Sequence, residues 1–277
     1  MSDAQLTTVL DAYSPAEIAH RVETVGVSKV RMNVLSKFVL ALLAGAFIAL
    51  GANGFTVTVT GAPATGLTRI AGGGVFCLGL ILVIVAGAEL FTGNTLKVMA
   101  FVSRRIRMVE LLRGWLIVYA GNFAGAVAIA AVVYLSGQAG MLEGRVGQTM
   151  VAIASAKLGY TFVQAVALGT LCNALVCLAV WLAFGSRSVA DKVLAILPPI
   201  TVFVAAGFEH SVANMYFVPL GIMVDGGATP GLTWTAFLWR NLLPVTLGNI
   251  FGGAVLVGAA YWFIYLRGGS GQSASRS

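Results

Sequence analysis

A chain of 277 residues with 58% hydrophobic and 10% charged residues is too apolar for a soluble globular protein, because soluble domains carry about 25% charged residues. Its charges are confined to short segments between long uncharged runs, which is the pattern of a polytopic helical membrane protein. The formal net charge of +7 does not indicate a nucleic-acid partner, since the basic residues lie in loops, where the positive-inside rule explains them.

The chain begins with a polar arm, residues 1–35, in which no secretory signal peptide is visible. Within it, the run Ser14-Pro15-Ala16-Glu17 is a capping box with proline at the first helical position, and apolar residues follow at helical spacing. We therefore expect an amphipathic helix over 14–30. It is too short and too charged to cross a bilayer, so we expect it to lie on the cytoplasmic membrane face.

Six apolar segments follow, at about 36–53, 71–102, 113–135, 160–184, 193–224 and 236–266. Four of them are close to the length of a single crossing, about 20 residues, or somewhat longer. The second and fifth are too long for one straight helix. The sequence thus predicts an all-α polytopic membrane protein, with six transmembrane helices over 36–267 and a short tail over 268–277.

The orientation follows from the basic residues. Six crossings place both termini on one side, and most lysines and arginines then fall on that side, in the arm, the second and fourth loops and the tail. By the positive-inside rule this side is the cytoplasm.

The two long segments carry copies of one string. Gly87–Asn94 and Gly207–Asn214 share the frame G-x-E-x-x-x-x-N, which puts a carboxylate and an amide inside an apolar run. A polar group at membrane depth costs several kcal/mol unless a partner satisfies it. Such an interruption indicates two half-helices joined by a loop that is buried in protein or lines a cavity. We therefore expect the second and fifth helices to be broken at the midplane, at a transport site.

The repeat extends into the third and sixth spans. Arg113 precedes Gly121-Asn122-x-x-Gly125 as Arg240 precedes Gly248-Asn249-x-x-Gly252. Spans 1–3 are thus predicted to be duplicated as spans 4–6. Because three crossings are an odd number, the halves enter from opposite sides, as a 3+3 inverted repeat with its site near the midplane.

At the two breaks the sequence places His210 in one half and Thr92 in the other. The start of a half-helix presents unpaired N–H groups and the positive end of its dipole, which suits a small anion. An imidazole adds a group that exchanges protons near physiological pH. A histidine in a protein core is more often structural, but its position at a helix break inside the membrane favours a functional role.

A supporting role is expected for four residues in the repeated frame: Glu89, Glu209, Asn94 and Asn214. A carboxylate can accept hydrogen bonds from exposed loop N–H groups, and a side-chain amide can replace missing helix hydrogen bonds. Direct contact with a substrate is the alternative. Asn122 and Asn249 are expected to serve helix packing through hydrogen bonds.

Two further polar residues belong to the candidate pathway. Lys157 lies just before the fourth span, on the predicted outer side, where it either is simply solvated or concentrates anions at a pore mouth. Asn173 lies deep in the fourth span and needs a partner or a water-lined surface. Apolar constrictions, with plain packing as the alternative, could be formed by Phe76, Leu80, Leu90, Phe91 and Phe203.

Several classes of site are missing from the sequence. There is no nucleotide-binding loop, no H-E-x-x-H, no C-x-x-C and no nucleophile with a partner base. The Asn-Pro-Ala pair of aquaporins is also absent. We interpret Cys77, Cys172 and Cys177 as small packing residues. The sequence therefore indicates neither an enzyme nor a metal or cofactor site.

Four strings together resemble the formate/nitrite transporter family: Gly87–Asn94, 171–181, 206–215 and 241–249. The resemblance covers nearly the whole chain, and the arm and the closing run 261–267 are most similar to the formate-channel branch. It implies an aquaporin-like protomer that assembles as a homopentamer, with one pore in each protomer. It also implies the inner, cytoplasmic membrane of a prokaryote.

The resemblance also implies roles for residues. The central histidine of the family corresponds to His210 and the opposing threonine to Thr92, while the vestibule lysine and asparagine and the loop asparagine correspond to Lys157, Asn173 and Asn214. Its hydrophobic slits correspond to the five apolar residues named above. Gly93-Asn94, after the threonine, is more similar to the nitrite and archaeal branches. Formate is the first expected substrate, followed by nitrite and hydrosulfide, with acetate and lactate as further anions.

The resulting hypothesis is passage of a small weak-acid anion. A bare anion in an apolar slit carries a large desolvation penalty, and proton transfer near His210 would remove most of it. Plain anion conduction past a neutral histidine is the alternative mechanism. A passive pore for a neutral solute and a structural membrane subunit are the alternative functions.

Overall fold

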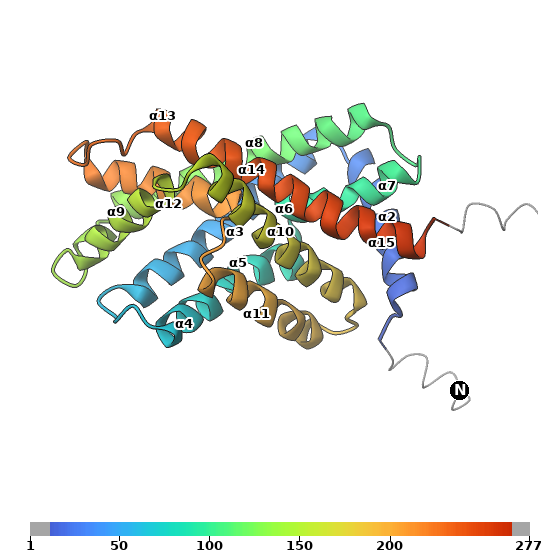
Figure 1. The fold of residues 1–277 in the computed structure, drawn as a ribbon, viewed down its shortest axis with the longest axis horizontal. Coiled ribbons are helices and arrows are strands. Elements are labelled where there is room, and N and C mark those ends of the chain that lie inside the picture. Colours follow the sequence, from blue (N-terminus) through green and yellow to red (C-terminus); the bar gives the residue numbers. More distant parts are fainter. Residues whose placement is uncertain (1–11, 268–277) are drawn as a thin grey trace, which may run out of the picture.

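The computed structural model describes residues 12–267, and all regular elements among them are helices (Figure 1). Residues 1–11 and the expected tail, 268–277, lie outside the described residues. Five described segments are long and apolar enough to cross a membrane: Val34–Val59, Gly66–Gly87, Met108–Leu135, Phe162–Gly185 and Trp234–Tyr265. A further apolar segment, 189–225, is divided in two. The all-α polytopic fold is confirmed.

The helices form two successive sets, each led by a short helix. The first set contains α2 (Pro15–Arg31), α3 (Val34–Val59), α4 (Gly66–Phe76), α5 (Leu78–Ile81), η1 (Leu82–Gly87), α6 (Phe91–Asn94), η2 (Thr95–Lys97), α7 (Val98–Val102) and α8 (Met108–Leu135). After η3 (Gln138–Gly140), the second set contains α9 (Arg145–Leu158), α10 (Phe162–Gly185), α11 (Val189–Ala205), α12 (Ser211–Asp225), α13 (Trp234–Ala236), η4 (Phe237–Leu242), α14 (Leu243–Ile250), η5 (Phe251–Ala259) and α15 (Ala260–Tyr265).

Helix α2 has the expected capping box but a different neighbour. The hydroxyl and amide of Ser14 both donate to the Glu17 carboxylate at 2.7 Å, and these hydrogen bonds lower the pKa of Glu17 below its ordinary value. The apolar stripe faces protein rather than lipid, because Ile18 and Val22 pack in a buried cluster with Trp181 of α10. Burial against protein removes this stripe from water as effectively as lipid would.

The first span is longer than the expected segment 36–53. Helix α3 begins at Val34 because Asn33 caps it, its Oδ1 accepting from two backbone N–H groups. It continues through a threonine-rich end because the hydroxyls there bond back to carbonyls four residues earlier, as Thr58 Oγ1 does to Gly54 O at 2.8 Å. This satisfies the polar side chains within the helix.

The predicted breaks in the second and fifth segments are confirmed. Helix η1 ends at Gly87 (φ 85°) and α6 begins at Phe91, while α11 ends before Gly207 (φ 75°) and α12 begins at Ser211. Each glycine takes the left-handed conformation that closes a helix. The next residue then donates to the carbonyl five residues back, Ala88 N to Val83 O at 2.9 Å and Phe208 N to Phe203 O at 3.0 Å.

Helix α9 was not expected from the sequence. Its polar residues Arg145, Gln148 and Lys157 interrupt the apolar pattern, so this stretch was expected to lie outside the spans as a loop. It packs closely on α12, where a Cβ added to Gly221 would collide with the Cβ of Ala154. Figure 1 shows α2 and α9 at opposite ends of the molecule. Each precedes the first span of its set, which supports the predicted duplication.

Close helix pairs in the two sets rely on equivalent glycines. Gly125 of α8 lies against the backbone of α3, where an added Cβ would collide with Leu42 O. Gly252 lies against α10 in the same way, facing Thr170 O. Small residues allow such contacts between membrane helices, whose association depends on tight packing.

We predict that Gly125→Ala destabilises the protein, because the new methyl group must displace the α3 backbone. Overpacking of this kind costs about 1–3 kcal/mol, which would appear as a lower thermal midpoint of the purified protein in detergent. Gly114→Ala is the matched control on the same helix, where an added Cβ meets no atom within 4 Å. Equal thermal midpoints for the two variants would contradict this prediction, because they would show that α3 and α8 can move apart around the new methyl group without loss of stability.

Candidate functional site

Two asparagines hold the loops at the helix breaks. Asn122 Oδ1 accepts from Phe91 N at 2.8 Å, and its Nδ2 donates to Ala41 O at 2.7 Å and Glu89 O at 2.9 Å. Asn249 makes the same set in the second half, with Ser211 N at 2.9 Å, Gly169 O at 2.8 Å and Glu209 O at 2.9 Å. Both side chains are fully buried.

This arrangement corrects one expectation. Asn122 and Asn249, expected to make hydrogen bonds in helix packing, bind the N–H groups of Phe91 and Ser211 at the ends of the loops. The backbone N–H groups of Glu89 and Glu209 donate to carbonyls of the first spans. Among the described residues, the carboxylates of Glu89 and Glu209 do not bind the loop N–H groups. The physical reason is that a break exposes both donors and acceptors. An amide can satisfy both, whereas an ionised carboxylate only accepts.

The Glu89 carboxylate instead binds cations and an amide. Its Oε1 lies 2.8 Å from Lys29 Nζ of α2, and its Oε2 lies 3.1 Å from Lys97 Nζ and 2.9 Å from Asn94 Nδ2. Glu89, Lys97 and Asn94 are buried, and Lys29 is partly exposed. Neither lysine was expected at this cluster.

The Glu209 carboxylate repeats this arrangement from the other half. Its Oε1 accepts from Lys157 Nζ of α9 at 2.8 Å, and its Oε2 accepts from Asn214 Nδ2 at 2.7 Å and Asn241 Nδ2 at 3.1 Å. Asn241 takes the place that Lys97 has in the first half, so this cluster is formally neutral while the Glu89 cluster carries a net positive charge. Asn241 was not expected at this site. A signal for Lys29 was present in the sequence, because Lys29 precedes Glu89 much as Lys157 precedes Glu209.

His210 and Thr92 meet across the two halves. His210 caps α12, with its Nδ1 accepting from Ala213 N at 3.1 Å, and its Nε2 lies 2.9 Å from Thr92 Oγ1. Because Nδ1 is occupied as an acceptor, the hydrogen-bond pattern assigns the proton of the neutral ring to Nε2. The imidazole is 3% exposed, so this Nε2–H is a donor in an almost entirely buried place.

A cavity of ≈ 170 Å³ opens beside His210 on the side of α9, and we call it the α9-side cavity. Its wall includes Lys157, Glu209 and two phenylalanines, Phe76 and Phe203. The Phe203 ring stacks on the imidazole with centroids 6.0 Å apart, and Phe76 meets Phe203 edge-on at 5.6 Å. The cavity therefore combines a cation with an aromatic wall next to the histidine.

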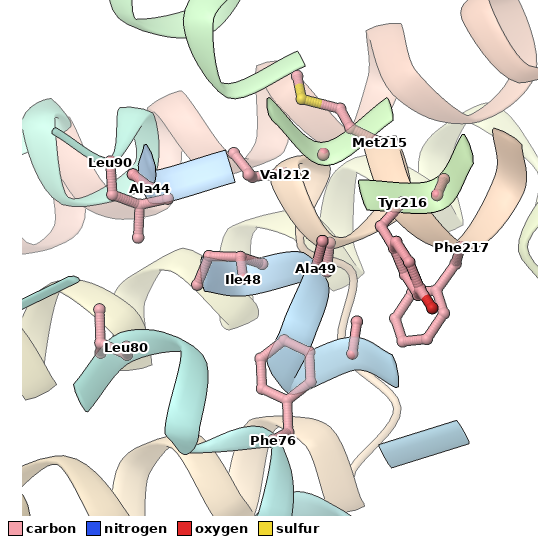
Figure 2. Close-up of a cluster of buried hydrophobic side chains, with 14 of the residues drawn as sticks. Ala44, Ile48, Ala49, Phe76, Leu80, Leu90, Val212, Met215, Tyr216 and Phe217 are labelled. Carbon is pink, nitrogen blue, oxygen red and sulfur yellow. The ribbon is translucent and has the colours of Figure 1, made fainter. Parts of the chain in front are cut away.

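On the opposite side, a cavity of ≈ 380 Å³ is lined by Lys29 and Glu89, and we call it the α2-side cavity. A smaller adjoining space of ≈ 60 Å³ reaches Leu80 and Leu90. Figure 2 shows these two leucines grouped around Ile48 of α3. The apolar residues between the cavities thus come from both sides of the first break.

Phe91, expected at a constriction, does not line these cavities. Its ring packs edge-on against Tyr119, with centroids 4.8 Å apart, and Phe91 is not among the described linings of the three spaces.

Asn173 also lies outside the described linings of these cavities. It is fully buried, and its Nδ2 donates to Asn249 O at 2.6 Å, Thr95 Oγ1 at 3.1 Å and Thr92 O at 3.2 Å. It thus has the partners that the sequence required, and it supports the backbone behind Thr92.

Comparison with known proteins shows similarity along nearly the whole chain. The family described as "Formate/nitrite transporter" matches residues 16–263. The chain is 42% identical to "Formate channel FocA" of Escherichia coli (strain K12) over 275 residues, covering 93% of this chain and 96% of that protein. It is 38% identical to the "Probable formate transporter" of Methanothermobacter thermautotrophicus, covering 92% and 97%.

Two solved structures are also similar. One is a "Pentameric formate channel with formate bound", with a TM-score of 0.78, 39% identity and coverage of 84% of this chain and 98% of that chain. The other is an "FNT family ion channel", with a TM-score of 0.81, 30% identity and coverage of 90% and 98%.

We predict that Asn249→Asp destabilises the protein by about 2–6 kcal/mol, since two buried carbonyls lose their donor at about 1–3 kcal/mol each. The thermal midpoint of the purified protein measures this loss, and Asn122→Asp should behave alike. Asn53→Asp is the control, because the half-buried Asn53 only accepts, from Tyr216 Oη at 2.9 Å, and an aspartate still accepts. If Asn249→Asp were as stable as this control, the amides would not hold the breaks.

Proposed function

This chain belongs to the formate/nitrite transporter family, and on that premise we propose that it conducts small monovalent weak-acid anions, with formate as its first substrate. The observation that carries the proposal is the contact between Thr92 Oγ1 and His210 Nε2, which joins the two halves between cavities that each contain a lysine. Several of the similar proteins are described as formate channels, which favours formate over nitrite and hydrosulfide.

The route that we propose begins at the α2-side cavity, passes Leu80 and Leu90, reaches Thr92 and His210, and leaves by the α9-side cavity. Lys29 and Lys157 lie at the two ends of this route, where each ammonium can donate a hydrogen bond to an entering anion. Each ammonium is held at its wall by a buried carboxylate, so the charge stays where the anion enters.

His210 has two possible roles on this route, and the geometry separates them. As a neutral ring, it donates the Nε2–H to the anion in place of Thr92 and transfers nothing. To give a proton to the anion it must first become an imidazolium, whose Nδ1–H would face the N–H of Ala213. Proton transfer therefore requires the cap of α12 to open, whereas hydrogen-bond donation does not.

Protonation would lower the cost of crossing the apolar section. A charged group in an apolar environment loses its hydration, whereas the neutral acid keeps only a dipole to satisfy. We include proton transfer at His210 in the proposal. When the cap opens, Nδ1 takes up a proton from water and the Nε2 proton passes to the anion, which leaves a neutral ring, and the acid releases its proton to water after it has crossed the apolar section. A passive pore for neutral solutes is the alternative, and the lysines of both cavities weigh against it.

We further propose a homopentamer with one route in each protomer, embedded in the lipid bilayer of a prokaryotic cytoplasmic membrane with the α2 side inside. The pentamer is supported by the similar formate channel, which is pentameric. The orientation rests on the positive-inside rule. Nitrite, hydrosulfide, acetate and lactate are the anions to test as competitors.

Uptake of labelled formate into proteoliposomes of the purified protein tests the proposal. We expect flux to rise as the external pH falls, because more of the substrate can be protonated. Formate flux that is absent while nitrite or hydrosulfide flux is present would change the substrate. Absence of all anion flux would favour a neutral-solute pore.

His210→Asn tests the proton-transfer step, because asparagine is a good N-cap residue and keeps an amide donor but does not titrate. We expect formate flux reduced by roughly a hundredfold or more, the contribution typical of a positioned proton donor, with a flattened pH dependence. His20→Asn, at the exposed histidine of α2, is the control. Unaltered flux and pH dependence in His210→Asn would exclude the transfer.

A further inference from the structure

Each cavity has further cations on its wall. Arg69 lines the α9-side cavity together with Lys157, and Lys192 and Arg21 line the α2-side cavity together with Lys29. The guanidinium of Arg21 stacks on the Tyr13 ring, 3.9 Å from its centroid. Arg69 is the fourth residue of α4 and Lys192 is the fourth residue of α11, the two helices that begin the broken segments. Arg69 and Lys192 thus occupy equivalent positions in the two halves.

Each of these cations faces the break of the other half. Helices α4 and α11 lie side by side (Figure 1), where Cys77 Sγ is 3.4 Å from Thr201 Oγ1, and they begin at opposite sides of the molecule. Arg69 reaches the second break, because its Nη2 lies 3.1 Å from the place a Cβ would take on Gly207. Lys192 shares its cavity with Gly87 and Glu89 of the first break.

Arg69 and Lys192 differ from Lys157 and Lys29 in having no carboxylate partner among the described residues. Lys157 binds Glu209 at 2.8 Å, and Lys29 binds Glu89 at 2.8 Å, a carboxylate that it shares with Lys97. Within residues 12–267, no carboxylate lies within 4.0 Å of the charged group of Arg69 or Lys192.

The acidic residues near Arg69 and Lys192 already have other partners. In the α9-side cavity, Glu209 is bound by Lys157 and two amides. In the α2-side cavity, Glu89 is bound by two lysines. Asp191, beside Lys192, accepts from Ser188 N at 2.9 Å in the cap of α11.

We propose that Arg69 and Lys192 are the anion-collecting residues of the two mouths, an inference that rests on the proposed function. An unneutralised charge in a cavity with low-dielectric walls raises the local anion concentration and the rate of entry. The two groups differ chemically. The planar guanidinium of Arg69 can bind a carboxylate through two parallel hydrogen bonds, whereas the ammonium of Lys192 is a point charge. The α9-side mouth therefore favours carboxylates over anions with a single acceptor atom.

Sided formate currents in planar bilayers at low ionic strength test the inference, with orientation reported by an N-terminal epitope tag that an antibody reaches from one chamber. We expect Arg69→Gln to lower the current of formate entering from the α9 side by roughly two- to fivefold, as expected for one unit charge near the path in water. The current from the α2 side should be unchanged, which also shows that the variant is folded. Lys192→Gln should lower the current of formate entering from the α2 side and leave the current from the α9 side unchanged.

Repeat-related arginines provide matched controls. Arg240 in η4 and Arg113 in α8 are exposed, and neither is among the described linings of the two cavities. Arg240→Gln and Arg113→Gln should leave both currents unaltered. At about 1 M salt, where the screening length is about 3 Å, the effects of Arg69→Gln and Lys192→Gln should disappear.

Arg69→Lys separates the charge from the shape of the group. It should keep the hydrosulfide current from the α9 side and lower the ratio of formate to hydrosulfide current. If Arg69→Gln and Arg240→Gln gave equal currents from both sides, the inference would be overturned while a conducting wild type upheld the proposed function. A wild type with neither formate current in these bilayers nor labelled formate flux in proteoliposomes would refute the proposed function itself. Flux without current would show that formate crosses together with a proton, and labelled formate entering from each side would then replace the currents as the measurement.

Discussion

The structure depends on how two interrupted helices satisfy their free backbone groups in an apolar environment. Each break leaves N–H and C=O groups without helical partners, and no water is available in a bilayer core to bind them. Asn122 and Asn249 solve this with one acceptor and two donors each, reaching from the third span of a set to the loop and to the first span. The same bonds thus fix the loop and tie three spans together.

With the backbone satisfied, the carboxylates of the breaks are free to hold cations. Glu89 and Glu209 each bind a lysine from a helix that precedes the first span of its set, so α2 and α9 contribute charge to the site as well as packing. The halves are not identical. Lys97 at one cluster and Asn241 at the other leave the α2-side cluster with an extra positive charge.

Local sequence patterns predicted much of this structure. Helical spacing, the Ser14 capping box and the duplicated frame gave the helices, the amphipathic arm and the positions of both breaks. The same patterns could not show which partner an amphipathic face or a polar side chain finds. For that reason the stripe of α2 was assigned to lipid, α9 was missed, and the loop N–H groups were assigned to glutamates instead of asparagines. Phe91, expected at a constriction, packs beside Tyr119.

The sequence by itself determined the membrane class, the broken helices and the list of polar residues within the apolar segments, because these follow from hydropathy and spacing along the chain. The tertiary structure alone decided the pairings. The contact of Thr92 with His210, the binding of Lys29 and Lys157 to their glutamates, and the approach of Arg69 to Gly207 join residues from different helices. Such contacts depend on how helices pack against one another, which no local pattern encodes.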